Sequence, residues 1–320
     1  MSGRARDQGA QELARAFQVQ RPRLVRLAYA TTGSLAEAED CVQEAWLRLR
    51  RIPDPGSIRA LGAWLTTTVS RLALDALGSA RARRERYVGP WLPEPLVEDL
   101  GGIDPADRVT LDESVSMALL VVLERLSPAE RTSFLLHDVF GMSFAEVAGV
   151  VGRSPAAVRQ LASRARQHVD GGRPRFPPTR AQQEELVTAF AAACAGGDLE
   201  GLVALLDPEV VWRADGGGKV TASLRVARGA DEVAHWLLGF MRHPPSLLRM
   251  ASVNGSPGLV VRDGGGVLTV VAFTVDGGRI TALDAIRNPD KLTALPEAGP
   301  GAGRACEGGA GQISGPRPPS

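Results

Sequence analysis

Three helix starts follow one another within residues 126–169, and this stretch constrains the fold more than any other. Ser127 stands before a proline and three residues before Glu130, the pattern of a capping box in which two side chains satisfy backbone amides at a helix start. Ser143 and Glu146 repeat the box, and a third helix start follows a glycine turn. The segment therefore has to fold as short helices joined by tight turns.

The third of these helices begins at Ser154-Pro155 after Gly152, and it combines an apolar stripe with a basic surface. Two short helices, a glycine turn and a basic second helix are typical of a helix-turn-helix, whose second helix lies in the DNA major groove. The apolar stripe recurs at helical spacing, at Val158, Leu161, Ala162, Ala165 and Val169. The side chains that we predict to contact DNA lie on the other faces: Arg153, Ser154, Arg159, Gln160, Ser163 and Arg164.

An ordinary helical hairpin with a solvated basic face is the alternative to this interpretation. The absence of acidic side chains opposite the arginines favours DNA. The total charge adds little, because the chain has a net charge of only +1 over 320 residues. The argument depends instead on two local basic clusters, at 81–86 and 153–175. The length leaves room for two or three domains.

Cys41, Cys194 and Cys306 are widely spaced and lack the pattern of a metal site. The first two fall in apolar helical patterns, which predicts buried thiols in a reducing compartment. The N-terminus is polar, unlike a signal peptide, and the longest apolar run, 117–123, is far shorter than the roughly 20 residues that span a bilayer. We therefore expect a cytoplasmic protein with no membrane segment, metal or cofactor.

Residues 10–80 form the first predicted domain, which is helical throughout. Its first helix covers 14–30, where Pro22 either kinks the helix or separates two helices. A second helix follows Ser34, which begins another predicted capping box. The N-terminal half of that helix is acidic, which suits the helix dipole and equally provides a docking surface for a basic partner. The acids are Glu37, Glu39, Asp40 and Glu44.

A third helix is predicted over about 57–77, and the basic run 81–86 follows it. Arginines there can meet DNA phosphates, although a basic last turn also favours any helix. Trp64 in this helix is either a core residue or a platform for an unpaired base.

These segments resemble a bacterial RNA polymerase sigma factor of the extracytoplasmic-function (ECF) type. Residues 33–50 and 63–77 match region 2 of that family, and the helix-turn-helix matches region 4. Three short motifs match a subgroup that carries an extra C-terminal SnoaL-like domain. They are YVGPWLPEP at 87–95, DGGGK at 215–219 and NPDKL at 288–292.

The resemblance implies core RNA polymerase and promoter DNA as partners, and it assigns a role to each set of residues. The acidic helix is implied to dock on the polymerase, and the helix-turn-helix set to read the −35 element. Gly78 stands where relatives often carry a basic residue. The contacts with DNA phosphates are therefore assigned to the arginines that follow it. The residues implied to serve the −10 element are Arg59, Trp64, Thr67, Arg71, Asp75, Arg81, Arg83 and Arg84.

The rest of the chain is organised as two linkers, a second helical domain, an α+β domain and a tail. The linkers cover 81–113 and 171–180, with the helix-turn-helix domain at 114–170 between them. Residues 296–320 are rich in Gly and Pro and are predicted to be disordered. The α+β domain, 181–295, resembles a SnoaL-like cone of helices on a curved antiparallel sheet, with helices at 183–195 and 231–241 and strands at 209–214, 247–253, 267–275 and 279–286.

Prolines in the first linker predict extended backbone over 91–95, where Trp91 and Leu92 need a surface to bury against. We expect the linker to dock on the C-terminal domain. In the resembling subgroup this domain modulates the sigma factor from within the same chain. The regulatory contacts implied are Trp91, Leu92, Pro93, Asp215, Lys219, Asn288, Asp290 and Lys291.

Such cones also hold small molecules or a catalytic Asp–His pair, which leaves two alternatives. One is a metabolite-binding or cyclase-type enzyme fused to a DNA-binding helical module, with Asp215, His235, Asp284 and Arg287 as candidates. The other is a helix-turn-helix regulator that does not dock on polymerase.

The favoured interpretation is a promoter-specificity subunit without catalytic residues. Its fold class is two all-α sigma domains, the second a helix-turn-helix, followed by an α+β SnoaL-like cone. Its C-terminal domain modulates activity and leaves room for an unidentified small-molecule ligand. Removal of residues 177–320 should change activity strongly, in a direction that the sequence leaves open.

Overall fold

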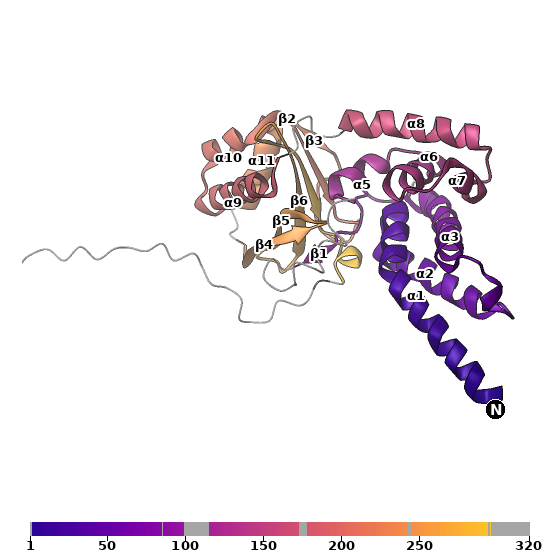
Figure 1. The fold of residues 1–320 in the computed structure, drawn as a ribbon. Helices are drawn as coiled ribbons and strands as arrows, with labels where there is room; N and C mark the ends of the chain where they lie inside the picture. The colour runs from indigo at the N-terminus through magenta and orange to yellow at the C-terminus, as the bar shows by residue number, and fades with distance from the viewer. Residues whose placement is uncertain are drawn as a thin grey trace, which may run out of the picture.

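The computed structural model describes residues 2–84, 86–98, 115–172, 178–241, 245–293 and 295. A helical part and a sheet domain lie side by side, and α5 and β1 lie where the two meet (Figure 1). The predicted tail at 296–320, Cys306 and about half of each predicted linker (85, 99–113 and 173–177) lie outside the described residues. No helix in the described ranges is long and apolar enough to cross a membrane.

The first half of the helical part contains three long helices. They are α1 (Ser2–Thr32), α2 (Leu35–Arg50) and α3 (Leu61–Arg84), with a short 3-10 turn at Pro55–Ser57. Pro22 lies inside α1 and does not interrupt it. α3 begins four residues later and ends seven residues later than the sequence predicts, because the proline-glycine turn extends to Ser57 and the arginine run continues the helix.

The second half of the helical part holds the three predicted helix starts. Both capping boxes form, at Ser127 and at Ser143, and Gly152 takes a φ of 70° between the last two helices. The elements are α5 (Met117–Leu123), α6 (Pro128–Phe134), a π turn (Leu135–Val139), α7 (Phe144–Val151) and α8 (Pro155–Gly172).

Both halves of the helical part share one hydrophobic core. Leu24 of α1 and Leu65 of α3 belong to the same cluster of buried side chains as Leu135 and Val158 of the helix-turn-helix half. The two predicted sigma domains are therefore packed directly against each other in this structure.

The C-terminal domain is built on a seven-stranded sheet in the order β1-β4-β5-β6-β7-β2-β3. Its helices are α9 (Arg180–Gly196), α10 (Leu199–Leu205) and α11 (Ala230–Met241), and a 3-10 turn (Pro289–Lys291) follows the last strand. The strands are β1 (Val97–Glu98), β2 (Leu206–Asp215), β3 (Ala227–Arg228), β4 (Leu247–Val253), β5 (Ser256–Arg262), β6 (Leu268–Asp276) and β7 (Arg279–Ile286).

The helices-on-sheet fold class is confirmed, but the sheet has three strands that the sequence does not predict, β1, β3 and β5, and one pair of strands in an unexpected direction. β2 pairs with β7 in parallel, not antiparallel, because β2 enters the sheet from α10 and not through a hairpin. β5 is a strand that the sequence pattern hides, since Pro257 and Gly258 are typical of a turn. Pro257 is tolerated because the pairing of β5 with β6 begins only at Gly258, so the proline lies at the strand end.

The sheet has two covered faces, and different parts of the chain cover them. One face packs against α9, α10 and α11 through residues such as Phe190 and Leu283. The opposite face buries Leu92 of the linker and Met117 of α5. The sheet domain therefore contacts the sigma part through the face that its own helices leave open.

Candidate functional site

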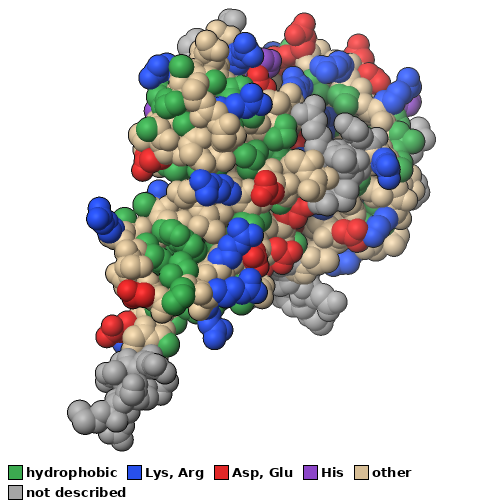
Figure 2. Space-filling view, turned by 90° about the vertical axis from the view of Figure 1, so that its right-hand side faces the viewer, with side chains coloured by type: hydrophobic (Ala, Val, Ile, Leu, Met, Phe, Trp, Pro, Cys, Tyr) green, Lys and Arg blue, Asp and Glu red, His purple; other side chains and the backbone are tan. Residues whose placement is uncertain are grey.

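Helix α8 presents the predicted −35 residues to solvent. Val158, Ala162, Ala165 and Val169 are buried beneath it, and Leu161 is half-buried. All six predicted DNA contacts are exposed. Ser154 also serves the helix itself, because its Oγ accepts a 3.2 Å hydrogen bond from the amide of Ala157. Figure 2 shows the side of the molecule that the helical part forms, where basic side chains lie in several small groups with acidic side chains between them.

The predicted −10 residues on and before α3 differ in exposure. Arg59 and Asp75 are exposed, whereas Thr67 and Trp64 are half-buried and Trp64 packs against the helical core. Arg71 is exposed, but its Nη2 donates a 2.8 Å hydrogen bond to the carbonyl oxygen of Gly149 in α7. The side chains of Arg81 and Arg83 lie outside the described part of the chain. In this arrangement the predicted −10 surface is in contact with the helix-turn-helix half.

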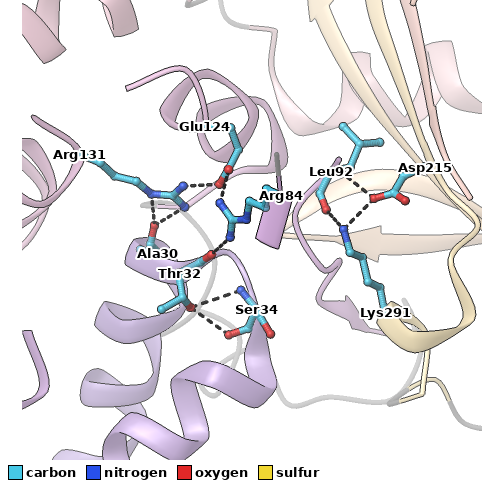
Figure 3. A network of polar contacts seen from close by, with 9 residues as sticks. All are labelled: Ala30, Thr32, Ser34, Arg84, Leu92, Glu124, Arg131, Asp215 and Lys291. Atoms are coloured by element: carbon cyan, nitrogen blue, oxygen red, sulfur yellow. Dashed lines mark hydrogen bonds and ion pairs between the residues drawn. The ribbon is translucent and has the colours of Figure 1, made fainter. Parts of the chain in front are cut away.

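Arg84, which is predicted to serve the −10 element, lies in a network that joins α3 to the ends of α1 and α5. Its guanidinium pairs with Glu124 at the end of α5 and donates a 2.5 Å hydrogen bond to the carbonyl of Thr32 (Figure 3). The same group lies 3.5 Å from the ring centre of Trp91. Three protein groups, the Glu124 carboxylate, the Thr32 carbonyl and the Trp91 ring, therefore contact the Arg84 guanidinium in this structure.

Arg131 completes this network and is almost fully buried, with 1% of its side chain exposed. It pairs with Glu124 and donates hydrogen bonds of 3.2 and 2.9 Å to the carbonyl of Ala30 at the end of α1. A buried guanidinium has to be paired in this way, because an uncompensated charge in the core is costly. The sequence offers no sign of this role, since Arg131 follows a capping box as an ordinary helical residue.

Asp215, at the end of β2, is the centre of a second network in which the linker docks on the sheet domain. The carboxylate is fully buried and accepts a 2.6 Å hydrogen bond from the hydroxyl of Tyr87 and a 2.8 Å bond from the amide of Leu92. Lys291 forms an ion pair with it at 2.7 Å and also donates to the carbonyl of Leu92 (Figure 3). Asp215, Leu92 and Lys291 come from the three sequence motifs, and here they meet at one point.

The side chain of Lys291 is largely enclosed between the linker and the sheet domain, with 12% of it exposed. Its ammonium lies 4.0 Å from the ring centre of Trp91, so that Trp91 has Lys291 and Arg84 as two cationic neighbours. Burial lowers the pKa of Lys291 to about 8, and the charge of Asp215 partly offsets that effect. Asp290 and Lys219, by contrast, form a largely exposed ion pair at 2.6 Å.

The glycines of the DGGGK motif make room for the linker. Gly217 has a φ of 60°, and a Cβ atom on it would collide with the side chain of Asn288 and lie 3.0 Å from the hydroxyl of Tyr87. Asn288 is buried and donates a 2.7 Å hydrogen bond to the same hydroxyl. The motif therefore forms a loop on which the linker docks.

Asn254, in the turn between β4 and β5, was not identified from the sequence, although it contacts three separated segments. Its backbone amide and its Oδ1 bind the carbonyl and the amide of Leu96, at 2.8 and 3.1 Å. Its Nδ2 donates to the hydroxyl of Tyr29 at 2.8 Å and to the carbonyl of Val115 at 3.4 Å. The only signal in the sequence is the pair Asn254-Gly255, which is typical of hairpin turns. Asn254 has the positive φ, 49°, that such turns require.

Glu94 of the linker takes the place of the predicted capping box at α2. Ser34 caps the helix by accepting from the amide of Glu37, but the Ser34 amide donates to Thr32 and not to Glu37. Glu94 Oε2 instead accepts hydrogen bonds from the Leu35 amide at 2.8 Å and from the Ser34 hydroxyl at 3.2 Å. The linker is thus bound to the first turn of the predicted polymerase-binding helix.

Comparisons with known proteins match both halves of the helical part. Residues 17–83 match the family model "Sigma-70 region 2", and residues 116–169 match "Sigma-70, region 4". The chain is 45% identical over 298 residues to ECF RNA polymerase sigma factor SigJ of Mycobacterium tuberculosis, covering 88% of this chain and 93% of the relative. The chain belongs to the ECF RNA polymerase sigma factors.

One further relative and one solved structure support the assignment of this sigma factor. SigI of M. tuberculosis, named as a probable ECF RNA polymerase sigma factor, is 38% identical over 282 residues, covering 88% of this chain and 94% of the relative. The crystal structure of M. tuberculosis SigJ superimposes with a TM-score of 0.72 at 42% identity and covers 88% of this chain and 98% of that one. Promoter-specific initiation of transcription is therefore the function of the chain, and its partners are core RNA polymerase and promoter DNA.

The acidic residues that the sigma factor resemblance assigns to polymerase binding lie along α2. Glu39 and Asp40 are exposed, whereas Glu37 and Glu44 are half-buried. Glu39 lies 3.3 Å from Arg21, and Glu44 lies 2.8 Å from Arg48. Exposed ion pairs of this kind contribute at most about 1 kcal/mol to stability. A basic partner can therefore take the place of Arg21 or Arg48 at a small cost in free energy.

The residues considered for catalysis in the sigma factor's C-terminal domain do not come together as an Asp–His pair. His235 is exposed on α11, on the side of the sheet opposite Asp215, and Asp215 is bound to Lys291 and the linker. Asp284 pairs with Arg213 at 2.5 Å, and Arg287 donates to Asp263. Within the described residues, no group of three or more His, Cys, Asp or Glu side chains is arranged to hold a metal ion.

Proposed function

We propose that this sigma factor is held in a closed form by its own C-terminal domain, and that release of the linker opens it for promoter binding. The observation that carries the proposal is the contact between Arg71 and Gly149, which joins the predicted −10 surface to the helix-turn-helix half at 2.8 Å. The −10 and −35 elements lie about 25 base pairs apart, which is roughly 85 Å at 3.4 Å per base pair. The two halves therefore have to separate before both elements are contacted.

The C-terminal domain stabilises the closed form by binding both sigma halves at once. The face of the sheet buries Met117 of α5, and Asn254 contacts α1 through Tyr29 and the start of the second half through Val115. Asp215 holds the linker, whose Glu94 is bound to the start of α2. Opening the molecule requires these contacts to break together.

In the opened form, the residues on each surface act as the family resemblance implies. We propose that Arg153, Arg159, Gln160 and Arg164 read the −35 element, because α8 exposes them while its apolar stripe is buried. Arg59, Thr67, Arg71 and Asp75 act on the −10 element, and the acids of α2 act on the polymerase. The sigma factor relatives support a transcription regulator rather than an enzyme.

In vitro transcription with purified core polymerase tests the proposal, using Asp215→Ala to release the linker. We expect several-fold more transcript from the cognate promoter than with the unchanged protein, because the closed form loses a buried ion pair and the two hydrogen bonds from Asp215 to the linker. Asp290→Ala is the matched control, because it removes only an exposed ion pair of the neighbouring motif. Equal transcription by the unchanged protein and Asp215→Ala, with Asp215→Ala still folded, would contradict the proposal.

A further inference from the structure

A cavity of about 300 Å³ lies where α1, the linker and the β4–β5 turn meet. It is beside the edge strand β1, and therefore outside the sheet face that α9, α10 and α11 cover. Hydrocarbon side chains form most of its wall. They include Val25 and Tyr29 of α1, Leu35 at the start of α2, Leu96 of the linker, Val115 and Leu295.

Arg26 gives this apolar cavity one unmatched charge. The side chain lines the cavity, and its Nε is buried without a hydrogen-bond partner. Burial lowers the pKa of Arg26, and the neighbouring charge of Arg23 lowers it further. No ion pair of the described residues includes Arg26. An unpaired guanidinium of this kind favours an anion, since a carboxylate satisfies its donors in a planar fork.

The other charged groups of the wall do not meet this need. Lys291 reaches the cavity, but its ammonium is bound to Asp215 and to the carbonyl of Leu92. Glu98 also lines the cavity and has an interaction partner of its own. A ligand that matches the cavity therefore has one acidic head and an apolar body.

We propose that this cavity binds a small amphipathic carboxylate, with its acid group on Arg26 and its hydrocarbon tail between α1, the linker and the β4–β5 turn. Cavities of this size are at the lower end of those that hold small organic ligands. The wall comes from both sigma halves, the linker and the sheet domain, so the complete site exists only in the closed form. A ligand that binds only one form stabilises that form. The expectation that the ligand inhibits transcription rests on the proposed function, whereas the expectation that it binds in this cavity does not.

Binding of octanoate and decanoate to the full-length protein, by calorimetry and by thermal unfolding, tests the site. We expect saturable binding at one site and a higher unfolding temperature, and we expect octan-1-ol, which lacks the charge, to bind at least tenfold more weakly. Arg26→Gln keeps the shape of the wall and should raise the Kd for octanoate at least tenfold. Arg23→Gln, on the exposed side of the same helix, is the matched control and should leave the Kd unchanged.

A second variant protects the test against a misfolded Arg26→Gln protein. Val25→Phe fills the cavity and keeps the arginine, so it should abolish octanoate binding while circular dichroism reports an intact fold. Binding that is equal in Arg26→Gln and the unchanged protein would overturn the proposal, as would the lack of saturable binding by either acid. These readouts need no polymerase, so their failure is distinct from failure of Asp215→Ala to raise transcription.

Discussion

The side-chain amide of Asn254 donates a 2.8 Å hydrogen bond to the hydroxyl of Tyr29, which lies 225 residues earlier in the chain. The same hydroxyl donates a 2.6 Å bond to the carbonyl of Glu94 in the linker. One buried hydroxyl therefore joins α1, the linker and the sheet domain. Burial raises the pKa of Tyr29, which keeps the hydroxyl protonated and able to donate.

We predict that Asn254→Gly loosens the closed form with little damage to the β4–β5 turn. Glycine accepts the positive φ of this position, so the substitution removes only the side-chain bonds to Leu96, Tyr29 and Val115. Each buried partner left unpaired costs about 1–3 kcal/mol. Chemical denaturation should show the loss, and a double-mutant cycle with Tyr29→Phe should give a coupling energy of about 0.5–3 kcal/mol. Strictly additive effects of the two substitutions would refute a direct coupling.

We predict that Asp215→Ala lowers the free energy of unfolding by roughly 3–5 kcal/mol, because it leaves the buried ammonium of Lys291 without its partner. Asp290→Ala should cost about 1 kcal/mol or less, since its ion pair with Lys219 is exposed. Urea denaturation of the two variants measures the difference. If both variants lose a similar free energy of unfolding, the buried ion pair contributes no more to stability than the exposed one, which contradicts the prediction.

Arg159→Ala should reduce transcription from the cognate promoter about tenfold or more while leaving stability within about 0.5 kcal/mol of the unchanged protein. The side chain is exposed on α8 and lies 5.0 Å from the ring centre of Phe144, so its loss removes the proposed base contact and little packing. Gln167→Ala, exposed on the C-terminal half of the same helix, is the matched control. The assignment fails if the two variants transcribe equally, or if promoter substitutions at −35 affect Arg159→Ala and the unchanged protein alike.

The closed form should become more stable as the pH rises from about 8 toward 10. Burial holds the pKa of Lys291 near 8 in the closed form, with Asp215, Arg84 and Glu124 as the charged groups that modify it. A lysine released to solvent has a pKa near 10.4, so the open form binds more protons in this window and the closed form gains stability with pH. Hydrogen exchange at the Leu92 amide measures the effect. Lys291→Met should remove this pH dependence, and slower exchange at lower pH, after correction for the intrinsic rate, would reverse the assigned sign.

The sequence alone determined the features that depend on neighbouring residues. Ser127 and Ser143 are followed by glutamates at the distance that a capping box requires, so the starts of α6 and α7 were predictable. The buried stripe of α8 follows from helical spacing, and the β6–β7 hairpin follows from its glycines. Together with the three short motifs, these local patterns indicated the family and the fold class.

Only the tertiary structure decided which distant groups meet. Arg131, Asn254 and Glu94 look like ordinary helix, turn and linker residues in the sequence, yet each binds a segment more than 50 residues away. The same holds for Arg84, whose pairing with Glu124 is not readable from the arginine run that contains it. The physical reason is that burial of an unpaired polar group is costly, and the partner that removes this cost is chosen by the packing of whole helices against the sheet, which local spacing does not encode.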